Sequence, residues 1–420
     1  MSFDNILHEI TSGLTGDQSN DVKYLMEQSE KYKDNEYSQE ILRAIGRIIH
    51  DIVPEELKNK FANEFNNFHI SIEKTLEEVD FLMYKNDFRK ALEMIEALVK
   101  KIEEMGFYKD DAVSEYHCFN NFLEEIIYRE LFNPQKAIRI IEPYYPLVYF
   151  KYGNLLFEYK KFIEARAALE IAEKYNPIDV NIKIELAETY KVEKNWDKFL
   201  SINKRIYDCS YTNEDLCRYY RNLGYYYIEK GNYDVAISVY ILSILFLEKT
   251  DIPETATAEN QRTMQLNMAK NQLAYIAQQS GKNFDIDDNS MKNGWRLSPR
   301  WITKDKTEWV LELLEEEVAD TKLLSISSVS KCLSENNIPF GTNPKILTIL
   351  KDIGQDAIYK NENVFARFVY KSLFNLTNNE LYLRVIKSLP KTDRKKETTK
   401  KNTAKKTTTK KNEPKDKGKK

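Results

Sequence analysis

Glycine and proline are scarce in this sequence: 420 residues include only 12 glycines and 11 prolines. Because these residues make most tight turns, their scarcity favours long helices over a turn-rich β fold. Apolar residues make up 42% of the chain, which is enough for a hydrophobic core. The length allows two or three domains, or one long repeat array with appended segments.

Cysteine and histidine are scarce as well, with four of each. No two cysteines have the CxxC spacing, and the histidines are scattered along the chain, so neither a metal site nor a disulfide framework is expected. No glycine-rich phosphate loop and no nucleophile elbow occur. We therefore expect no catalytic residue, no metal and no cofactor, and predict that the protein is not an enzyme.

Long apolar runs are also missing. The longest, at 237–247, is well short of the roughly 20 residues that a membrane-spanning helix needs. The first residues, MSFDNILHEI, lack a basic region followed by an apolar stretch, so no secretory signal is expected. These observations predict a cytoplasmic protein without a membrane contact.

Charge is unevenly distributed along the chain. Residues 391–420 hold 14 of the 63 basic and 4 of the 66 acidic residues, which leaves 49 basic and 62 acidic residues in 1–390. In this tail, lysine pairs recur every five residues between threonine-rich triplets, and it resembles the basic tails of histone-like proteins. Such a composition predicts a disordered tail. It would serve either as a solubilising extension or as a non-specific contact to nucleic-acid phosphates.

The most informative stretch is 220–243. Small and apolar residues occur there in a fixed order: Tyr220, Leu223, Gly224, Tyr227, Tyr233, Ala236, Tyr240 and Ser243. This order resembles one tetratricopeptide repeat, a helix-turn-helix unit of about 34 residues that stacks on copies of itself. Gly224 and Ala236 would let the two helices lie close together, and Gly231 with Asn232 would form the turn between them.

The same pattern predicts an all-α, tetratricopeptide-like solenoid over residues 71–280. Residues 146–179 form a good repeat and another begins at Val180, whereas 71–104 is degenerate and 112–145 is poorer. The small residues Gly153 and Ala187 are 34 positions apart, and Gly224 follows after 37 more. A helix at 254–279 would cap the last repeat. Residues 1–68 are expected to be an N-terminal helical extension, with helices at 38–53 and 57–68.

The C-terminal part differs in character. Residues 281–305 are expected to be a linker, with a basic aromatic cluster that either pins it to a neighbouring domain or stacks on bases. Residues 306–388 are predicted to hold helices at 309–318, 327–336 and 343–353, and a β-hairpin at 356–370. This order loosely resembles a winged helix. The resemblance implies a nucleic-acid surface made of Lys345, Lys351, Lys360 and Arg367.

Tetratricopeptide arrays bind extended peptides or helices along the concave face made by the first helix of each repeat, so the resemblance implies a protein-binding scaffold. The residues expected to face this groove are Phe150, Asn154, Phe157, Ile184, Glu188, Lys191, Arg221, Tyr225 and Ile228.

Some members of the family bind the carboxyl end of a chaperone through a basic clamp. Asn154, Arg218 and Asn222 partly match that clamp, but Phe150 and Glu185 stand where lysine and asparagine are required. Chaperone-tail binding is therefore not expected. Two hypotheses remain: an adaptor whose solenoid binds a protein, or a regulator that contacts DNA or RNA through the C-terminal domain and the tail.

Overall fold

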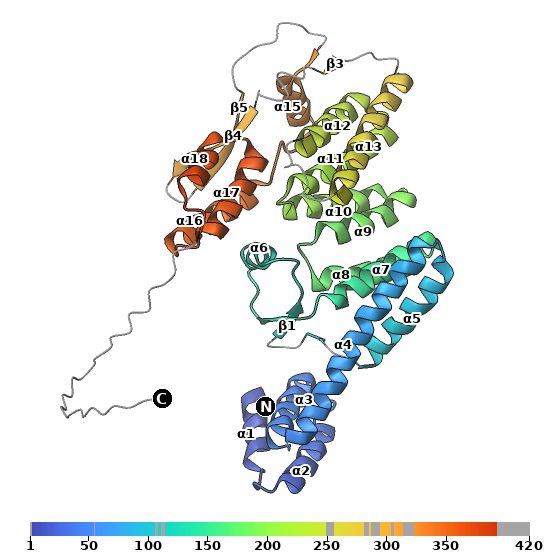
Figure 1. Cartoon of the computed structure of the whole chain (residues 1–420), viewed down its shortest axis with the longest axis vertical. Helices are drawn as coiled ribbons and strands as arrows, with labels where there is room; N and C mark the ends of the chain where they lie inside the picture. The colour runs from blue at the N-terminus through green and yellow to red at the C-terminus, as the bar shows by residue number, and fades with distance from the viewer. Residues whose placement is uncertain are drawn as a thin grey trace, which may run out of the picture.

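The computed structural model is an elongated chain of helices, with an N-terminal bundle, a central stack of helix pairs and a C-terminal helical group (Figure 1). Its backbone is described over residues 2–53, 55–105, 108–110, 114–248, 256–280, 285–286, 295–303, 306–313 and 323–392. Side chains are described over the same ranges except for residue 50, residues 55–67, residue 105, residues 256–258 and the segments between 285 and 324. The fold is all-α in character and forms a tetratricopeptide-like solenoid, as predicted.

Three helices form the N-terminal bundle: α1 (Phe3–Ser12), α2 (Gln18–Lys31) and α3 (Ser38–Ile52). The helix predicted at 38–53 is confirmed as α3. The bundle has a small core of its own, which consists of Ile6, Ile10, Leu25, Ile41 and Ile45.

The separate helix predicted at 57–68 is wrong. Residues 55–84 form one continuous helix, α4 (Glu55–Tyr84), which leaves the N-terminal bundle and becomes the first helix of the solenoid (Figure 1). The boundary predicted between the extension and the repeats therefore falls inside a helix. The reason is that no glycine or proline interrupts 57–84, so no strong helix breaker stops propagation there.

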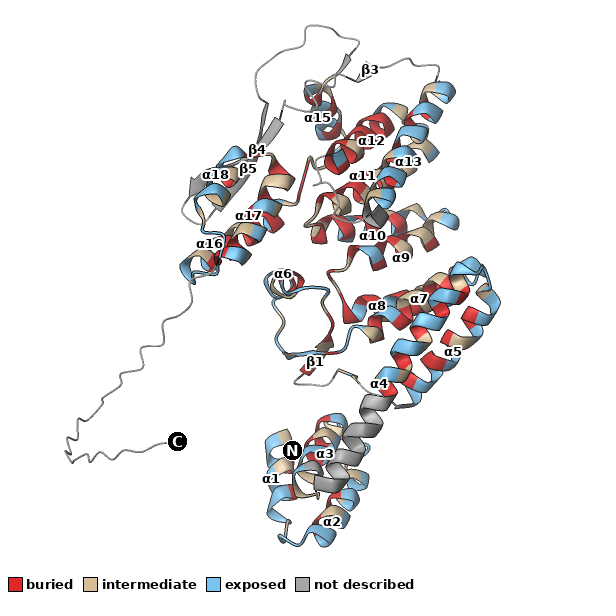
Figure 2. Cartoon of the chain, viewed as in Figure 1, coloured by how far each residue is buried: buried red, intermediate tan, exposed pale blue. Residues whose placement is uncertain are grey.

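Four helix pairs make up the solenoid: α4 with α5 (Phe88–Met105), α7 (Tyr144–Glu158) with α8 (Phe162–Tyr175), α9 (Val180–Val192) with α10 (Trp196–Cys209), and α11 (Asn213–Glu229) with α12 (Tyr233–Glu248). Buried residues face the partner helix within each pair and the neighbouring pairs (Figure 2).

The turns inside these pairs share one geometry. Asn86, Lys160, Lys194 and Gly231 all have positive φ. In each case the next residue donates its amide to the carbonyl five positions earlier, as in Asn232 to Tyr227 at 2.9 Å. This closes the helix C-terminus and turns the chain back. Each turn residue lies seven positions after a residue of the close-packed face, namely Val79, Gly153, Ala187 and Gly224.

In two of these pairs the residue at the close contact between the helices is a glycine. A Cβ on Gly153 would lie 2.7 Å from the Leu169 side chain, and a Cβ on Gly224 would lie 2.4 Å from the Tyr240 ring. Both contacts join residues 16 positions apart. The close approach predicted for Gly224 is therefore present in the structure, and it sets the distance between α11 and α12.

The repeat predicted at 112–145 is wrong. Residues there form strand β1 (Ser114–His117), helix α6 (Phe122–Phe132) and strand β2 (Ala137–Ile140). β1 and β2 pair in parallel, with Ser114 opposite Ala137. The stretch AIRI is strand β2. Pro134 stands before it, and two of its four residues are β-branched isoleucines, which favours an extended backbone.

Helix α13 (Ala256–Ser280) follows the last pair and packs on α12, as predicted for a capping helix. Ala269, Leu273 and Ile276 of α13 are buried in the core of the solenoid.

The segment from 285 to 324 differs from the prediction. Strands β4 (Trp295–Thr303) and β5 (Lys306–Leu313) form an antiparallel hairpin, and short strands β3 (Asp285–Ile286) and β6 (Leu323–Leu324) pair in parallel. The linker predicted at 281–305 therefore contains two strands, β3 and β4. The helix predicted at 309–318 is wrong over 309–313, which belong to β5, and the rest of it lies outside the described residues.

The C-terminal group consists of α15 (Ile326–Glu335), α16 (Pro344–Tyr359), α17 (Asn363–Thr377) and α18 (Glu380–Ser388). The β-hairpin predicted at 356–370 is wrong, since these residues end α16 and form the first half of α17. Without that hairpin the resemblance to a winged helix is lost.

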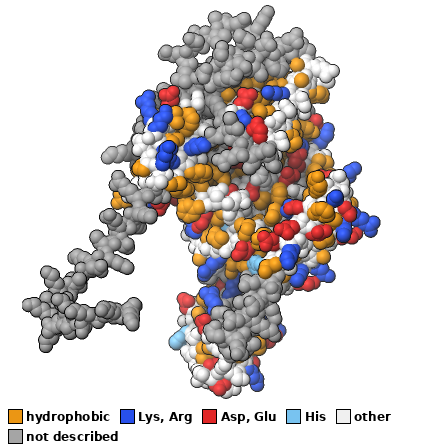
Figure 3. Space-filling model, viewed as in Figure 1, with side chains coloured by type: hydrophobic (Ala, Val, Ile, Leu, Met, Phe, Trp, Pro, Cys, Tyr) orange, Lys and Arg blue, Asp and Glu red, His pale blue; other side chains and the backbone are white. Residues whose placement is uncertain are grey.

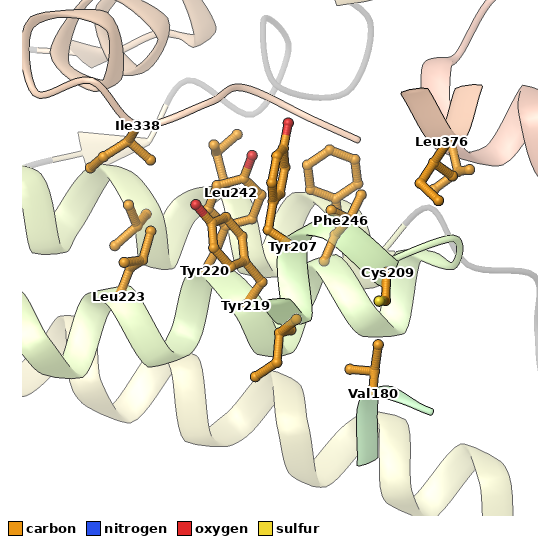
Figure 4. Packing of buried hydrophobic residues seen from close by; sticks show 14 of the residues in the cluster. Val180, Tyr207, Cys209, Tyr219, Tyr220, Leu223, Leu242, Phe246, Ile338 and Leu376 are labelled. Carbon is orange, nitrogen blue, oxygen red and sulfur yellow. The ribbon is translucent and has the colours of Figure 1, made fainter. Parts of the chain in front are cut away.

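The pair α16–α17 instead repeats the solenoid geometry. Asn361 has positive φ, and the Glu362 amide donates to the Ala357 carbonyl at 2.9 Å. A Cβ on Gly354 would lie 2.9 Å from the Tyr370 ring, again 16 positions away. Buried residues of this group share one core with the solenoid; Ile338 and Leu376 are seen near Tyr220 and Phe246 in Figure 4.

Candidate functional site

A pocket of about 500 Å³ opens beside three successive first helices of the solenoid, α7, α9 and α11. Phe150 and Asn154 reach it from α7, Asn181 and Glu185 from α9, and Arg218 from α11. Its volume lies in the range of small-ligand and side-chain pockets. Of the residues predicted for the groove, Phe150 and Asn154 line this pocket.

The walls of the pocket differ in chemistry. Pro143, Pro146, Leu147, Phe150 and Ile182 supply an apolar wall. The remaining lining residues are mostly amides and acids, and Arg218 is the only cationic one among the described residues that line it. Arg218 donates from Nη1 to Oδ1 of Asn181 at 2.6 Å, which ties α11 to α9. A ligand would meet an apolar surface on one side and hydrogen-bonding groups on the other.

One rim of the pocket comes from the loop before α6, which lies outside the repeats. The buried carboxylate of Glu124 holds this loop in place. Glu124 on α6 is 3% exposed. It accepts hydrogen bonds from the backbone N–H of Asn120 at 2.7 Å, from Asn176 Nδ2 at 3.0 Å and from the Tyr211 hydroxyl at 3.0 Å. These bonds fix the loop with Asn120 against the start of α9 and the start of α11. The rim is thereby preorganised.

Two polar groups in the pocket have no hydrogen bond within the described part of the chain. Oδ1 of Asn154 is buried and has no partner there. Glu185, also at the pocket, makes neither a hydrogen bond nor an ion pair with a described residue. Burial raises the pKa of Glu185, and nearby Glu188 adds to this while Arg218 opposes it. Unpaired polar groups in a half-buried site cost folding free energy that a ligand can recover.

A second cluster lies further along the same helices. Glu188 forms an ion pair with Lys191, whose ammonium lies 4.8 Å from the centre of the Tyr225 ring. Beyond it, Lys194 pairs with Glu229 at 3.2 Å. The charges here are mostly paired with each other. Figure 3 likewise shows acidic, basic and apolar side chains interleaved over much of the visible face of the solenoid.

The nine predicted groove residues therefore divide into several groups. Phe150 and Asn154 line the pocket, and Glu188, Lys191 and Tyr225 form the second cluster. Ile184 is only 7% exposed and packs in the core, so its prediction as a groove-surface residue is wrong. The others, which are half-buried, are Phe157, Arg221 and Ile228.

The sequence did not indicate that Cys118, Asn120, Asn176 and Asp179 would line the pocket. They come from the loops before α6 and α9. No local signal points to them, because Asn120 is placed by Glu124 and by Asp179, which lies 59 residues away in sequence. Glu185 and Arg218, which the sequence comparison places at clamp positions of tetratricopeptide proteins, both line the pocket.

The cationic residues predicted to contact nucleic acid are partly engaged within the protein. Arg367 donates to the carbonyls of Ile386 and Leu389 and so caps the end of α18. Lys360 pairs with Asp356 on α16 at 2.6 Å. Lys345 is exposed, and burial lowers the pKa of Lys351. The tail beyond 392 lies outside the described residues, so its role stays a prediction.

Within the described residues, no group of three or more histidine, cysteine, aspartate or glutamate side chains is placed to hold a metal ion. Cys118 and Cys217 are buried, and burial raises the pKa of each thiol to about 11. Such thiols are poor nucleophiles. No helix in the described part of the chain is both long and apolar enough to cross a membrane.

Comparison with protein-family models gave no match, and no curated protein matched the sequence. Among solved structures, the chain is similar to one described as "Crystal structure of APC/C hetero-tetramer Cut9-Hcn1", with 13% identity and a TM-score of 0.21. The match covers 92% of this chain and 68% of the other. A score this low carries no argument about fold or function.

Proposed function

We propose that this chain is a non-enzymatic scaffold that binds an extended segment of a partner protein along α7, α9 and α11. The observation that carries the proposal is the pocket beside these helices, with an apolar wall next to the unpaired Oδ1 of Asn154. A side-chain amide can donate to and accept from one peptide group of an extended chain. Binding would then satisfy a buried polar group that the free protein leaves unpaired.

The arrangement suits a peptide better than a small metabolite. The polar groups are spread over three helices and two loops rather than converging on one point. Neighbouring packed helices lie about 8–10 Å apart, so a ligand reaching from α7 to α11 spans roughly 20 Å. An extended peptide covers that distance with about six residues.

Selection from a random peptide display library tests the proposal. The bait is the full chain, and the library holds peptides of about 12 residues, long enough to cross three helices. We expect selected peptides to bind at least about tenfold more weakly to the Phe150→Ala and Asn154→Ala variants, as expected for loss of a buried contact.

The matched control is Ile163→Ala, because Ile163 is an aliphatic residue on α8 and is 72% exposed. It removes apolar surface elsewhere on the same repeat and should leave peptide binding unchanged. If the library yields no peptides, or only peptides that bind these three variants equally well, the proposed function is wrong.

A further inference from the structure

We propose that the pocket selects a lysine or arginine side chain of the bound segment, with Glu185 as its charge partner and Asn154 holding the adjacent backbone. This inference rests on the proposed function and adds the chemistry of the residue that is recognised. It concerns one section of the groove, between α7 and α9.

The charges that line the pocket support a cation. Two carboxylates, Asp179 and Glu185, face a single cation, Arg218. Asp179 is already engaged, since its carboxylate accepts hydrogen bonds from the backbone N–H of Asn181 at 2.8 Å and from Asn120 Nδ2 at 3.0 Å. Arg218 is engaged with Asn181. Glu185 is the charged lining residue left without a hydrogen bond or ion pair among the described side chains.

The surroundings of Glu185 make a negative ligand unfavourable. Glu188 and Glu158 act on Glu185 as like charges, and the opposite charges of Arg218 and Lys191 are already engaged with Asn181 and Glu188. A ligand carboxylate would therefore meet several acids and would have to compete for Arg218. A ligand ammonium or guanidinium would instead neutralise the unpaired carboxylate, and charge-assisted hydrogen bonds of this kind are about twice as strong as neutral ones.

The apolar wall suits the rest of such a side chain. Lysine and arginine carry three or four methylene groups that pack on apolar surface while the charged end reaches a polar partner. Leu147, Phe150 and Ile182 are available for these methylenes, and they line the same pocket as Glu185. Asn154, one turn after Phe150 on α7, then has a peptide group within the ligand backbone as its partner.

Peptides selected on the full chain supply the probe. We expect a basic residue at one fixed position of those peptides whose binding requires Phe150 and Asn154. Replacing that residue by norleucine, which keeps the methylenes and removes the charge, should weaken binding to the wild type about tenfold. The same replacement should change binding to the Glu185→Gln variant by less than about threefold, because the charge partner is already gone.

Glu185→Gln is suited to this test because it removes a half-buried charge without changing the size of the side chain. Its matched control is Glu170→Gln, because Glu170 is an exposed glutamate on α8. In binding to this variant, the norleucine replacement in the peptide should keep its tenfold effect. If groove-dependent peptides carry no basic residue, or the effect of norleucine is equal in wild type and Glu185→Gln, this inference is wrong while the proposed function stands. If no peptide depends on Phe150 or Asn154, both are wrong.

Discussion

The hydroxyl of Tyr220 on α11 accepts a hydrogen bond from the amide of Gly341, 121 residues later in the chain, at 2.7 Å. It also donates to the carbonyl of Pro339 at 2.8 Å. The Tyr220 side chain is fully buried and stacks on the ring of Phe246, with centroids 5.8 Å apart. One side chain of the best-conforming repeat therefore ties the segment after α15 to the solenoid.

Removing this hydroxyl should destabilise the whole chain. In Tyr220→Phe the Gly341 amide and the Pro339 carbonyl lose a buried partner, while the ring packing is kept. We expect the free energy of unfolding to fall by about 1–3 kcal/mol, measured by urea denaturation. Tyr159→Phe is the control, because Tyr159 is 43% exposed and should tolerate the change. Equal midpoints for the two variants would contradict a structural role for the Tyr220 hydroxyl.

Two glycines in helices should respond to alanine in opposite directions. A Cβ on Gly224 would lie 2.4 Å from the Tyr240 ring, whereas a Cβ on Gly46 of α3 would meet no atom within 4 Å. We expect Gly224→Ala to cost about 1–3 kcal/mol through overpacking. Gly46→Ala should add about 0.5–1 kcal/mol, because alanine loses less backbone entropy in a helix. Thermal unfolding of the two variants measures both. A similar shift in both variants would mean that α11 and α12 are not closely packed at Gly224.

The repeats could be predicted because their signal is local. A small residue, a turn seven positions later and a contact sixteen positions later are set by the geometry of two packed helices. The same signal is present at Gly354, Asn361 and Tyr370, yet the residue pattern there predicts a hairpin. The alternation in VFARFVY favours a strand, but the buried positions in and just before it, Asn363, Ala366, Val369 and Tyr370, are spaced by three or four, as on one helix face.

The site could be predicted only in part. Phe150 and Asn154 follow from their positions beside Gly153 in the repeat. The rest of the pocket depends on α6 and its loop, which interrupt the repeats, and on Glu124, whose partners Asn176 and Tyr211 lie 52 and 87 residues away. Contacts of such range leave no periodic trace in a single sequence.

The free energy of unfolding should decrease as the pH rises from about 4 to about 6, because Asp215 loses its proton in this range. Asp215 and Thr212 form a capping box at the start of α11, and burial raises the pKa of Asp215 from 3.8 to about 6. A raised pKa means that the folded state binds the proton more tightly than the unfolded state. The contribution of protonated Asp215 to the free energy of unfolding is therefore complete below 3.8, the pKa in the unfolded chain, and is lost as the pH rises through about 6.

Urea denaturation at several pH values checks this contribution. Asp215→Asn keeps the size of the side chain and cannot titrate, so its free energy of unfolding should decline less between about pH 4 and pH 6 than that of the wild type. Glu214→Gln is the control at the neighbouring position. Parallel curves for wild type and Asp215→Asn would show that Asp215 does not titrate in this range.

The second cluster of the groove offers a further test of the binding face. Tyr225 lies under the Lys191 ammonium, and Arg221, one turn earlier on α11, has a buried Nη1 without a hydrogen bond to a described residue. Arg221→Glu combined with Tyr225→Ala reverses a charge and removes an aromatic contact. We expect peptides selected on the wild type to lose at least about tenfold in affinity, with helicity unchanged by circular dichroism.

A double variant away from α11, Lys198→Glu on α10 with Tyr159→Ala at the C-terminal end of α7, makes the same chemical changes at exposed positions. It should bind the selected peptides as well as the wild type does. If the α11 variant binds normally while Asn154→Ala does not, the bound segment is confined to the pocket between α7 and α9. That result would restrict recognition to the section with Glu185, since Tyr225 then lies beyond the end of the ligand.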